Sequence, residues 1–257
     1  MNHVNFLNPR EIVGPNYSMH PGPFAISETY LNKIFPGISK VHPELRKDGD
    51  YVHRKGDLDP PNIRFLARLV KYLQPLTMAE VGVFRGRTTY HMALNSPEAR
   101  IVGIDLPKEM RTGHEEYYST DKVYFLPENE IGKLFKNTEY EKNIQTVWAD
   151  SLTPECRKKL DAALDGSMID FAFIDSSHDY ESVKRNFEDL VLPRVAPDGV
   201  VLFDDYARLA THPGVTHFLA RKAHDDGYVF YWYAPQGDNT QCAFFINNPE
   251  SVGYRWK

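Results

Sequence analysis

The sequence of 257 residues contains few cysteines and no long apolar segment. Its two cysteines, Cys156 and Cys242, lie far apart and match no metal-binding spacing, so they imply neither a disulfide framework nor a cysteine metal site. No apolar run approaches the roughly 18 residues that a membrane-spanning helix requires, and residues 1–23 lack the apolar core of a signal peptide. These absences predict a cytoplasmic protein without a membrane partner.

Positive charge is not clustered either. The chain has 30 Lys and Arg residues against 35 Asp and Glu, which gives a formal net charge of −5. Nucleic-acid binding requires a basic face that neutralises phosphates, so we expect no nucleic-acid partner. Apolar residues make up 42% of the chain and charged residues 25%, which is typical of a globular protein. The length fits one large α/β domain with an appendage.

From residue 58 onward, strand patterns and helix patterns alternate along the chain. This alternation predicts a Rossmann-like, doubly wound α/β fold whose sheet is mostly parallel. The last two strands follow one another directly and are expected to form an antiparallel hairpin at one edge. Seven strands are expected, in segments 76–83, 99–107, 143–151, 168–177, 196–206, 228–235 and 241–247.

Two parts of the chain fall outside this alternation. Residues 1–57 are rich in Pro, Gly, Asn and Tyr and are predicted to form an N-terminal arm that acts as a lid, while residues 58–257 form the domain. Residues 107–143 are a long, polar and aromatic insertion after the second strand, and such insertions are commonly functional or mobile. An arm without a core of its own can reach a neighbouring subunit, which allows a homo-oligomer.

The first expected strand runs into a glycine turn. Glu80, Gly82 and Gly86 form the pattern E-x-G-x-x-x-G between a strand and a helix. Glycines let the backbone turn sharply and let a ligand approach closely, and the amides of the following helix point toward that ligand. Thr88 and Thr89 then supply donors suited to a carboxylate. A tight strand-to-helix turn without any ligand would show the same pattern.

The second and third expected strands also end in acids. Asp105 stands where the second strand of a nucleotide-binding fold places an acid that accepts hydrogen bonds from two ribose hydroxyls. Asp150 and Ser151 end the third strand, where they could contact the amino group and ring nitrogens of an adenine. Either residue could equally cap the helix that follows, so both interpretations stay open.

The fourth and fifth expected strands end in three carboxylates, in FIDSSHDY and LFDDY. If those strands are neighbours, Asp175 lies close to Asp204 and Asp205 at one edge of the sheet. Converging carboxylates repel one another, and a divalent cation such as Mg²⁺ or Mn²⁺ relieves this repulsion. In the alternative arrangement Asp205 caps a helix and the other two face water. His178 could be a base, a metal ligand or a helix cap.

Together these segments resemble class I S-adenosylmethionine-dependent methyltransferases. The resemblance rests on AEVGVFRGRTT, IVGIDLP and, above all, FIDSSHDYESVKRNFEDLVLPRVAPDGVVLFDDY, and it covers roughly residues 75–247. More narrowly, the chain is similar to the family that contains macrocin and mycinamicin O-methyltransferases and cephalosporin hydroxylase-like proteins. Many members of that family have glycine directly after the first Asp of the third segment, where this chain has Ser176.

The resemblance implies a role for each matched residue. The cofactor positions, from the methionine part through the ribose to the adenine, fall on Glu80, Gly82, Gly86, Asp105, Asp150 and Ser151. Asp175, Asp204 and Asp205 fall on the metal-ligand positions, and Asp175 also borders the cofactor. His178 falls on the position of the family's general base.

The resemblance therefore implies a metal-assisted O-methyltransferase that acts on a hydroxyl of a small molecule, such as a sugar or another natural product. Coordination to Mg²⁺ or Mn²⁺ would lower the pKa of the hydroxyl, and His178 would take its proton. One alternative is a metal-independent methyltransferase for amines or phenols, and another is a Rossmann-like nucleotide-binding protein. Tyr117, Tyr118 and Tyr124 could stack on the acceptor or belong to the core.

Overall fold

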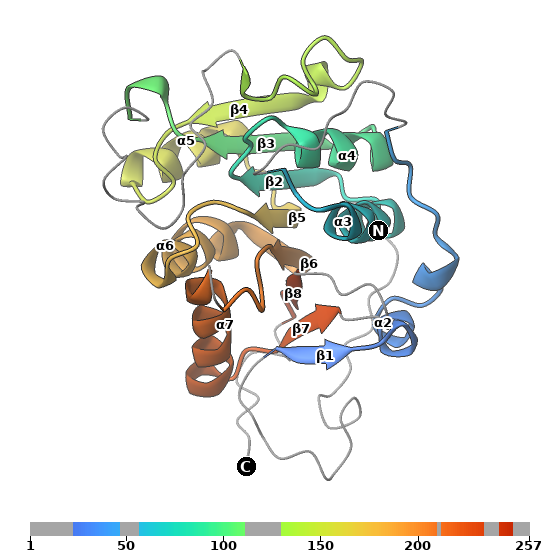
Figure 1. Ribbon diagram of the computed structural model, residues 1–257. Coiled ribbons are helices and arrows are strands. Elements are labelled where there is room, and N and C mark those ends of the chain that lie inside the picture. The colour runs from blue at the N-terminus through green and yellow to red at the C-terminus, as the bar shows by residue number, and fades with distance from the viewer. Residues whose placement is uncertain (1–22, 47–56, 111–129, 210–211, 234–241, 249–257) are drawn as a thin grey trace.

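The computed structural model describes residues 23–46, 57–110, 130–209, 212–233 and 242–248. The strands are β1 (Phe24–Ile26), β2 (Thr77–Val81), β3 (Arg100–Asp105), β4 (Ile144–Trp148), β5 (Ile169–Ile174), β6 (Val195–Phe203), β7 (Phe230–Tyr233) and β8 (Ala243–Ile246). They form one eight-stranded sheet in the order β1-β7-β8-β6-β5-β2-β3-β4 (Figure 1).

Five of these strands, β6-β5-β2-β3-β4, run parallel to one another. The final strands β7 and β8 pair antiparallel, and β8 also pairs antiparallel with β6. The count of seven expected strands is too low by one, because β1 comes from the N-terminal arm and pairs parallel with β7. A strand of three residues is too short to show the alternation that marks a strand in a sequence.

Helices cover both faces of the sheet (Figure 1). The α-helices are α2 (Glu28–Ile34), α3 (Pro60–Leu73), α4 (Arg87–Asn95), α5 (Pro154–Leu164), α6 (Tyr180–Arg185) and α7 (Pro213–Asp226). One apolar core lies under α2, α3 and α4, and a second lies under α5, α6 and α7. Neighbouring residues of β2 point to opposite cores, Met78 to the first and Ala79 to the second. Within the described ranges, no helix is long and apolar enough to cross a membrane.

Short helical turns complete the fold. They are η1 (Ile38–Lys40), η2 (Lys108–Met110), η4 (Glu141–Asn143), a π-helical turn η5 (Asn186–Val191) and η6 (Leu192–Arg194). The π-helical turn continues α6, so the single helix that the sequence predicts here changes its hydrogen-bond pattern halfway along.

The part of the arm that the structure describes is packed into the domain. Phe35 is fully buried in the core under α3, where its ring lies against Tyr72 and Phe244. Farther along, Lys71 forms an ion pair with Glu44. Residues 1–22 lie outside the described residues, so the lid stays a prediction.

The strand order reverses between β5 and β2. From β2 the chain moves outward through β3 to β4, and from β5 it moves outward in the other direction to β6. In open α/β sheets, ligands bind beside such a switch point, outside the carboxyl ends of the strands. The acids and glycines that the sequence singles out all lie near the carboxyl ends of these strands or follow them directly.

Candidate active site

Gly82 follows β2 at the switch point and has a left-handed backbone, with φ of +97°. A Cβ atom at this position would lie 1.8 Å from the carbonyl oxygen of Asp175, which follows the neighbouring strand β5. The Asp175 amide in turn donates to the Val81 carbonyl. Glycine is therefore required here because two chain segments meet at the switch point, and this close contact fixes Asp175 against the end of β2.

Gly86 is also left-handed, with φ of +79°, and it is the N-cap of α4. A Cβ atom here would lie 2.5 Å from the ring of Phe135, which comes from the insertion between β3 and β4. The insertion is bonded to the glycine turn as well, because the Gly132 amide donates to the Phe84 carbonyl at 2.9 Å. Residues 130–136 thus brace the turn, whereas Tyr117, Tyr118 and Tyr124 lie outside the described residues.

Glu80 is fully buried in β2. The Thr89 hydroxyl donates to its Oε2 atom, and the Oε1 atom has no hydrogen-bond partner among the described residues. Burial raises the pKa of Glu80 well above its usual range, and the nearby charges of Asp175 and Asp105 raise it further. Thr88 and Thr89 are both buried, so neither hydroxyl is displayed to solvent, and that of Thr89 holds Glu80.

Asp105, at the end of β3, holds the glycine turn from the other side. Its Oδ2 atom accepts hydrogen bonds from the amides of Val83 and Phe84, at 3.1 and 2.9 Å, and its Oδ1 atom accepts one from Leu106. These bonds stabilise Phe84, whose φ of +49° is unusual for a residue other than glycine. Asp105 therefore orders the turn, whatever its role toward a ribose.

Asp150 and Ser151 follow β4, and neither is the cap of the next helix. Thr153 is the N-cap of α5, and its hydroxyl accepts from the Cys156 amide. Asp150 closes a short turn by accepting a hydrogen bond from the Leu152 amide at 2.9 Å. The capping alternative for Asp150 and Ser151 is thus wrong.

The three acids that follow β5 and β6 converge as expected from the sequence. Oxygen atoms of Asp175, Asp204 and Asp205 all lie within 4.8 Å of one another. Burial raises the pKa of Asp204 well above its usual range, and the charges of Asp175 and Asp205 raise it further. Asp205 caps no helix in the structure; it is buried, with a left-handed backbone of φ +57°.

Asp204 is held by two residues that are not among the site residues expected from the sequence. Asn62 on α3 donates from Nδ2 to Asp204 Oδ1 at 3.0 Å, and the Cys242 thiol lies 3.6 Å from the same oxygen. Asn62 precedes Leu66 by one helical turn on the buried face of α3. A polar residue within this apolar stripe is the sequence feature that could have indicated a buried polar partner. Cys242 offered no comparable signal.

His178 lies on the loop between β5 and α6 and faces the carboxylates. Its Nε2 atom is 3.1 Å from Asp205 Oδ2 and 3.4 Å from Asp175 Oδ1. The helix cap is Asp179, whose side chain accepts from the Ser182 amide, so His178 is not a cap. Ser176, which replaces the glycine of many relatives, accepts a hydrogen bond from Asn186 of the π-helical turn at 2.7 Å.

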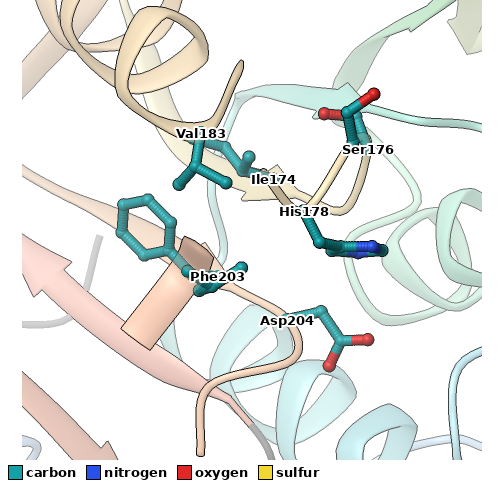
Figure 2. Close-up of a pocket in the computed structure, with 8 residues that line it drawn as sticks. Ile174, Ser176, His178, Val183, Phe203 and Asp204 are labelled. Atoms are coloured by element: carbon teal, nitrogen blue, oxygen red, sulfur yellow. The ribbon is translucent and has the colours of Figure 1, made fainter. Parts of the chain in front are cut away.

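A small recess opens beside these residues, with about 180 Å³ of empty space including open solvent. Its lining residues are Ile174, Ser176, Ser177, His178, Val183, Phe203, Asp204 and Val215. The His178 ring and the Asp204 carboxylate project to the same side, away from Phe203 and Val183 (Figure 2). The recess has essentially no room for a whole water molecule, so it does not by itself hold an acceptor molecule.

Arg208 and His212 also contact Asp205, and neither was singled out from the sequence. Arg208 Nε lies 3.0 Å from Asp205 Oδ1, and His212 Nδ1 lies 3.4 Å from Asp205 Oδ2. Both residues belong to the loop between β6 and α7, where the sequence shows no recognisable pattern. Arg208 also pairs with Asp59, the N-cap of α3, whose side chain makes no capping bond.

Most residues of this site fall within a segment that matches a known protein family. Residues 79–206 match the model of a methyltransferase domain. This segment therefore resembles a methyltransferase domain. It contains each cofactor, metal and base position expected from the sequence, from Glu80 to Asp205. Asn62, His212 and Cys242 lie outside the matched segment.

One curated relative is similar to a large part of the chain. A protein of Arabidopsis thaliana named "Putative caffeoyl-CoA O-methyltransferase" is 30% identical over 179 residues, an alignment that covers 66% of this chain and 65% of that protein. The chain thus spans somewhat less than two thirds of the length of this relative.

Solved structures share the fold of this chain. The O-methyltransferase TomG of Streptomyces achromogenes, bound to S-adenosylmethionine, has a TM-score of 0.57 and 14% identity, covering 86% of this chain and 95% of that one. An O-methyltransferase of Bacillus cereus, bound to S-adenosylhomocysteine, has a TM-score of 0.53 and 14% identity, covering 86% and 96%. The sheet described above therefore has the same fold as the sheets of these two structures.

Proposed function

We propose that the protein is an S-adenosylmethionine-dependent O-methyltransferase that methylates a hydroxyl of a small molecule, such as a sugar or another natural product. One observation carries the proposal: Asp175, His178, Asp204 and Asp205 converge at the carboxyl edge of the sheet, within a segment that matches the model of a methyltransferase domain. This arrangement combines oxygen ligands for a cation with a base, beside the strand ends where folds of this kind bind ligands.

The residues around the glycine turn fit S-adenosylmethionine, whose sulfonium and ammonium groups are positively charged. Glu80 has a buried oxygen without a partner among the described residues, and Asp105 and Asp175 lie close enough to affect its pKa. This concentration of acids favours a cationic ligand. When bound, S-adenosylmethionine supplies the methyl group and is left as S-adenosylhomocysteine.

The three carboxylates fit Mg²⁺ or Mn²⁺, which prefer oxygen ligands. Asp204 is buried next to two other acids, an arrangement that is costly for ionised groups unless a cation is present. Asn62 fixes the orientation of Asp204 through its hydrogen bond. When bound, the cation lowers the pKa of an acceptor hydroxyl.

His178 is proposed as the general base. His178 would accept the hydroxyl proton at Nε2 when the acceptor oxygen takes the methyl group that the cofactor supplies. Asp205 and Asp175 lie beside this nitrogen and stabilise the resulting imidazolium by ion pairing. Backbone contacts around Gly82 and the cap at Asp179 hold the loop that carries the base.

The acceptor class rests on the chemistry of the carboxylates. A sugar hydroxyl, as the likeness to macrocin and mycinamicin O-methyltransferases suggests, is weakly acidic and gains most from a cation. The name of the Arabidopsis relative points instead to a phenol. A phenol or an amine needs less activation, so a metal-independent enzyme acting on these groups is the alternative.

The test is transfer of a labelled methyl group from S-adenosylmethionine to a panel of sugars, macrolides, phenols and amines, with Mg²⁺ or with a chelator. We expect transfer to a hydroxyl that requires the cation and falls about a hundredfold or more in Asp204→Asn. His178→Gln should lose about a hundredfold or more as well, while His224→Gln, which changes an exposed histidine of α7, serves as control. Transfer that is indifferent to the chelator would support the metal-independent alternative.

A further inference from the structure

Two histidines approach the same carboxylate oxygen beside the three acids. His178 Nε2 lies 3.1 Å from Asp205 Oδ2, and His212 Nδ1 lies 3.4 Å from that same atom. The two imidazole rings are in edge contact, with centroids 4.3 Å apart. The three ligand atoms all lie within 4.8 Å of one another, so they form a second cluster that shares only Asp205 with the first.

The backbone holds these histidines together. A Cβ atom at Gly214, at the start of α7, would lie 2.3 Å from the carbonyl oxygen of His178, so α7 packs directly against the loop that carries this histidine. The His212 amide donates to the Arg208 carbonyl at 2.7 Å, which closes the loop in front of α7. The side chains of His178, His212 and Asp205 are 22%, 12% and 6% exposed, which shields them while leaving access for an ion.

The chemistry of this cluster differs from that of the three carboxylates. Two imidazole nitrogens and one carboxylate suit Zn²⁺, Co²⁺ and related transition metals, whereas Mg²⁺ prefers oxygen alone. With metal–ligand distances of about 2.0–2.2 Å, tetrahedral ligand atoms lie about 3.4 Å apart. The observed 3.1 and 3.4 Å to Asp205 Oδ2 match this spacing.

We propose that His178, Asp205 and His212 form a second cation site, for a transition metal such as Zn²⁺, which overlaps the magnesium site through Asp205. Binding there uses the lone pairs of His178 Nε2 and His212 Nδ1, so a proton carried by either nitrogen is released to solvent. Arg208 holds the other oxygen of Asp205, and its charge is shared with Asp59. Asp59 therefore offsets part of the repulsion between Arg208 and a cation bound at the other oxygen of Asp205.

The consequence for catalysis rests on the function proposed above. A metal bound to His178 removes the base, and a metal bound to Asp205 competes with Mg²⁺ for a shared ligand. We therefore infer that micromolar transition metal inhibits methyl transfer even when Mg²⁺ is abundant. The binding itself requires neither cofactor nor acceptor, so it can be tested separately from activity.

The experiment titrates the metal-free protein with Zn²⁺ by calorimetry and with Co²⁺ by visible absorption, followed by Mg²⁺ titrations. We expect one site and an intense Co²⁺ spectrum of a low-coordinate ion with nitrogen ligands. His212→Gln and, independently, His178→Gln should each weaken Zn²⁺ and Co²⁺ binding at least tenfold, because even loss of a residue behind a ligand costs that much. His212→Gln should leave Mg²⁺ affinity unchanged.

His224→Gln is the matched control, because His224 lies near the other end of α7 and also pairs with an aspartate, Asp225. Circular dichroism identifies any variant that fails to fold. If one histidine variant does not fold, the metal affinity of the other histidine variant decides whether the site exists. Equal Zn²⁺ affinity in the wild type and either folded variant would overturn the proposal, as would a weak six-coordinate Co²⁺ spectrum. Zn²⁺ binding that depends on both histidines, in a protein that transfers no methyl group, would uphold this site and overturn only the proposed function.

Discussion

The close contact at the switch point leads to a quantitative prediction for Gly82→Ala. The substitution adds a Cβ atom to a residue with φ of +97°, at 1.8 Å from the carbonyl oxygen of Asp175. Both the left-handed backbone and the clash lower the stability of the folded protein when Gly82 is replaced by Ala. Because the obstructing atom is backbone, it cannot rotate away as a side chain would, so β2 and β5 must separate at their carboxyl ends.

Gly166→Ala provides the matched control. Gly166 has a similar φ of +78°, but an added Cβ atom would meet nothing within 4 Å. The control therefore measures the cost of the left-handed backbone alone, about 1–2 kcal/mol. Gly82→Ala carries the same cost and an overpacking cost of about 1–3 kcal/mol in addition. We expect a total destabilisation of about 2–5 kcal/mol.

Urea unfolding followed by circular dichroism measures both variants, and the difference between them isolates the contact with Asp175. Because the substitution displaces Asp175, Mg²⁺ affinity should fall in Gly82→Ala and stay unchanged in Gly166→Ala. Equal free energies of unfolding for the two variants, together with wild-type Mg²⁺ binding, would refute the idea that this glycine positions the metal ligand.

Three further predictions concern groups around the site. Burial raises the pKa of Glu80, so the folded protein binds this proton more tightly than the unfolded chain, and stability falls as pH rises from the ordinary carboxyl pKa through the raised one. Glu80→Gln should flatten this decline in urea titrations at several pH values, and an unchanged profile would contradict the assignment. Arg85→Met breaks a buried ion pair with Asp57 and should cost about 3–5 kcal/mol. The double replacement with Asp57→Leu should recover most of this loss, and simple additivity would argue against coupling. Burial raises the pKa of the Cys156 thiol to about 11, and Cys242 is also fully buried, so neither should react with a thiol reagent before unfolding. A fast-reacting thiol would disprove this.

Much of the fold follows from the sequence, because the elements of the sheet carry strong periodic patterns. The helix PECRKKLDAAL, residues 154–164, has the same bounds in the structure as in its pattern. The strand β1 could not be predicted, because its three residues gain their pairing only from β7, about 200 residues away in the chain. The π-helical turn after α6 was likewise invisible, since its apolar residues also fit an ordinary helix.

The sequence predicts those site residues whose position is set by the end of the strand that carries them. Asp175, Asp204 and Asp205 converge because parallel neighbouring strands end at one edge, which the order of elements implies. Asn62 and His212 reach the same acids from α3 and from the loop before α7, and no local pattern encodes such long-range contacts. For Gly82 and Asp105 the pattern predicts contacts with a ligand. In the structure both residues also order the chain itself, Gly82 at its contact with Asp175 and Asp105 through its bonds to the glycine turn.

The most direct test of the proposed function is the binding of S-adenosylmethionine to the purified protein, measured by isothermal titration calorimetry. The site predicts saturable binding of one molecule per chain, weakened when Glu80 is replaced by Gln because the ligand is cationic. Absence of binding at millimolar S-adenosylmethionine would contradict the account, because the glycine turn and its acids would then serve only to order the chain.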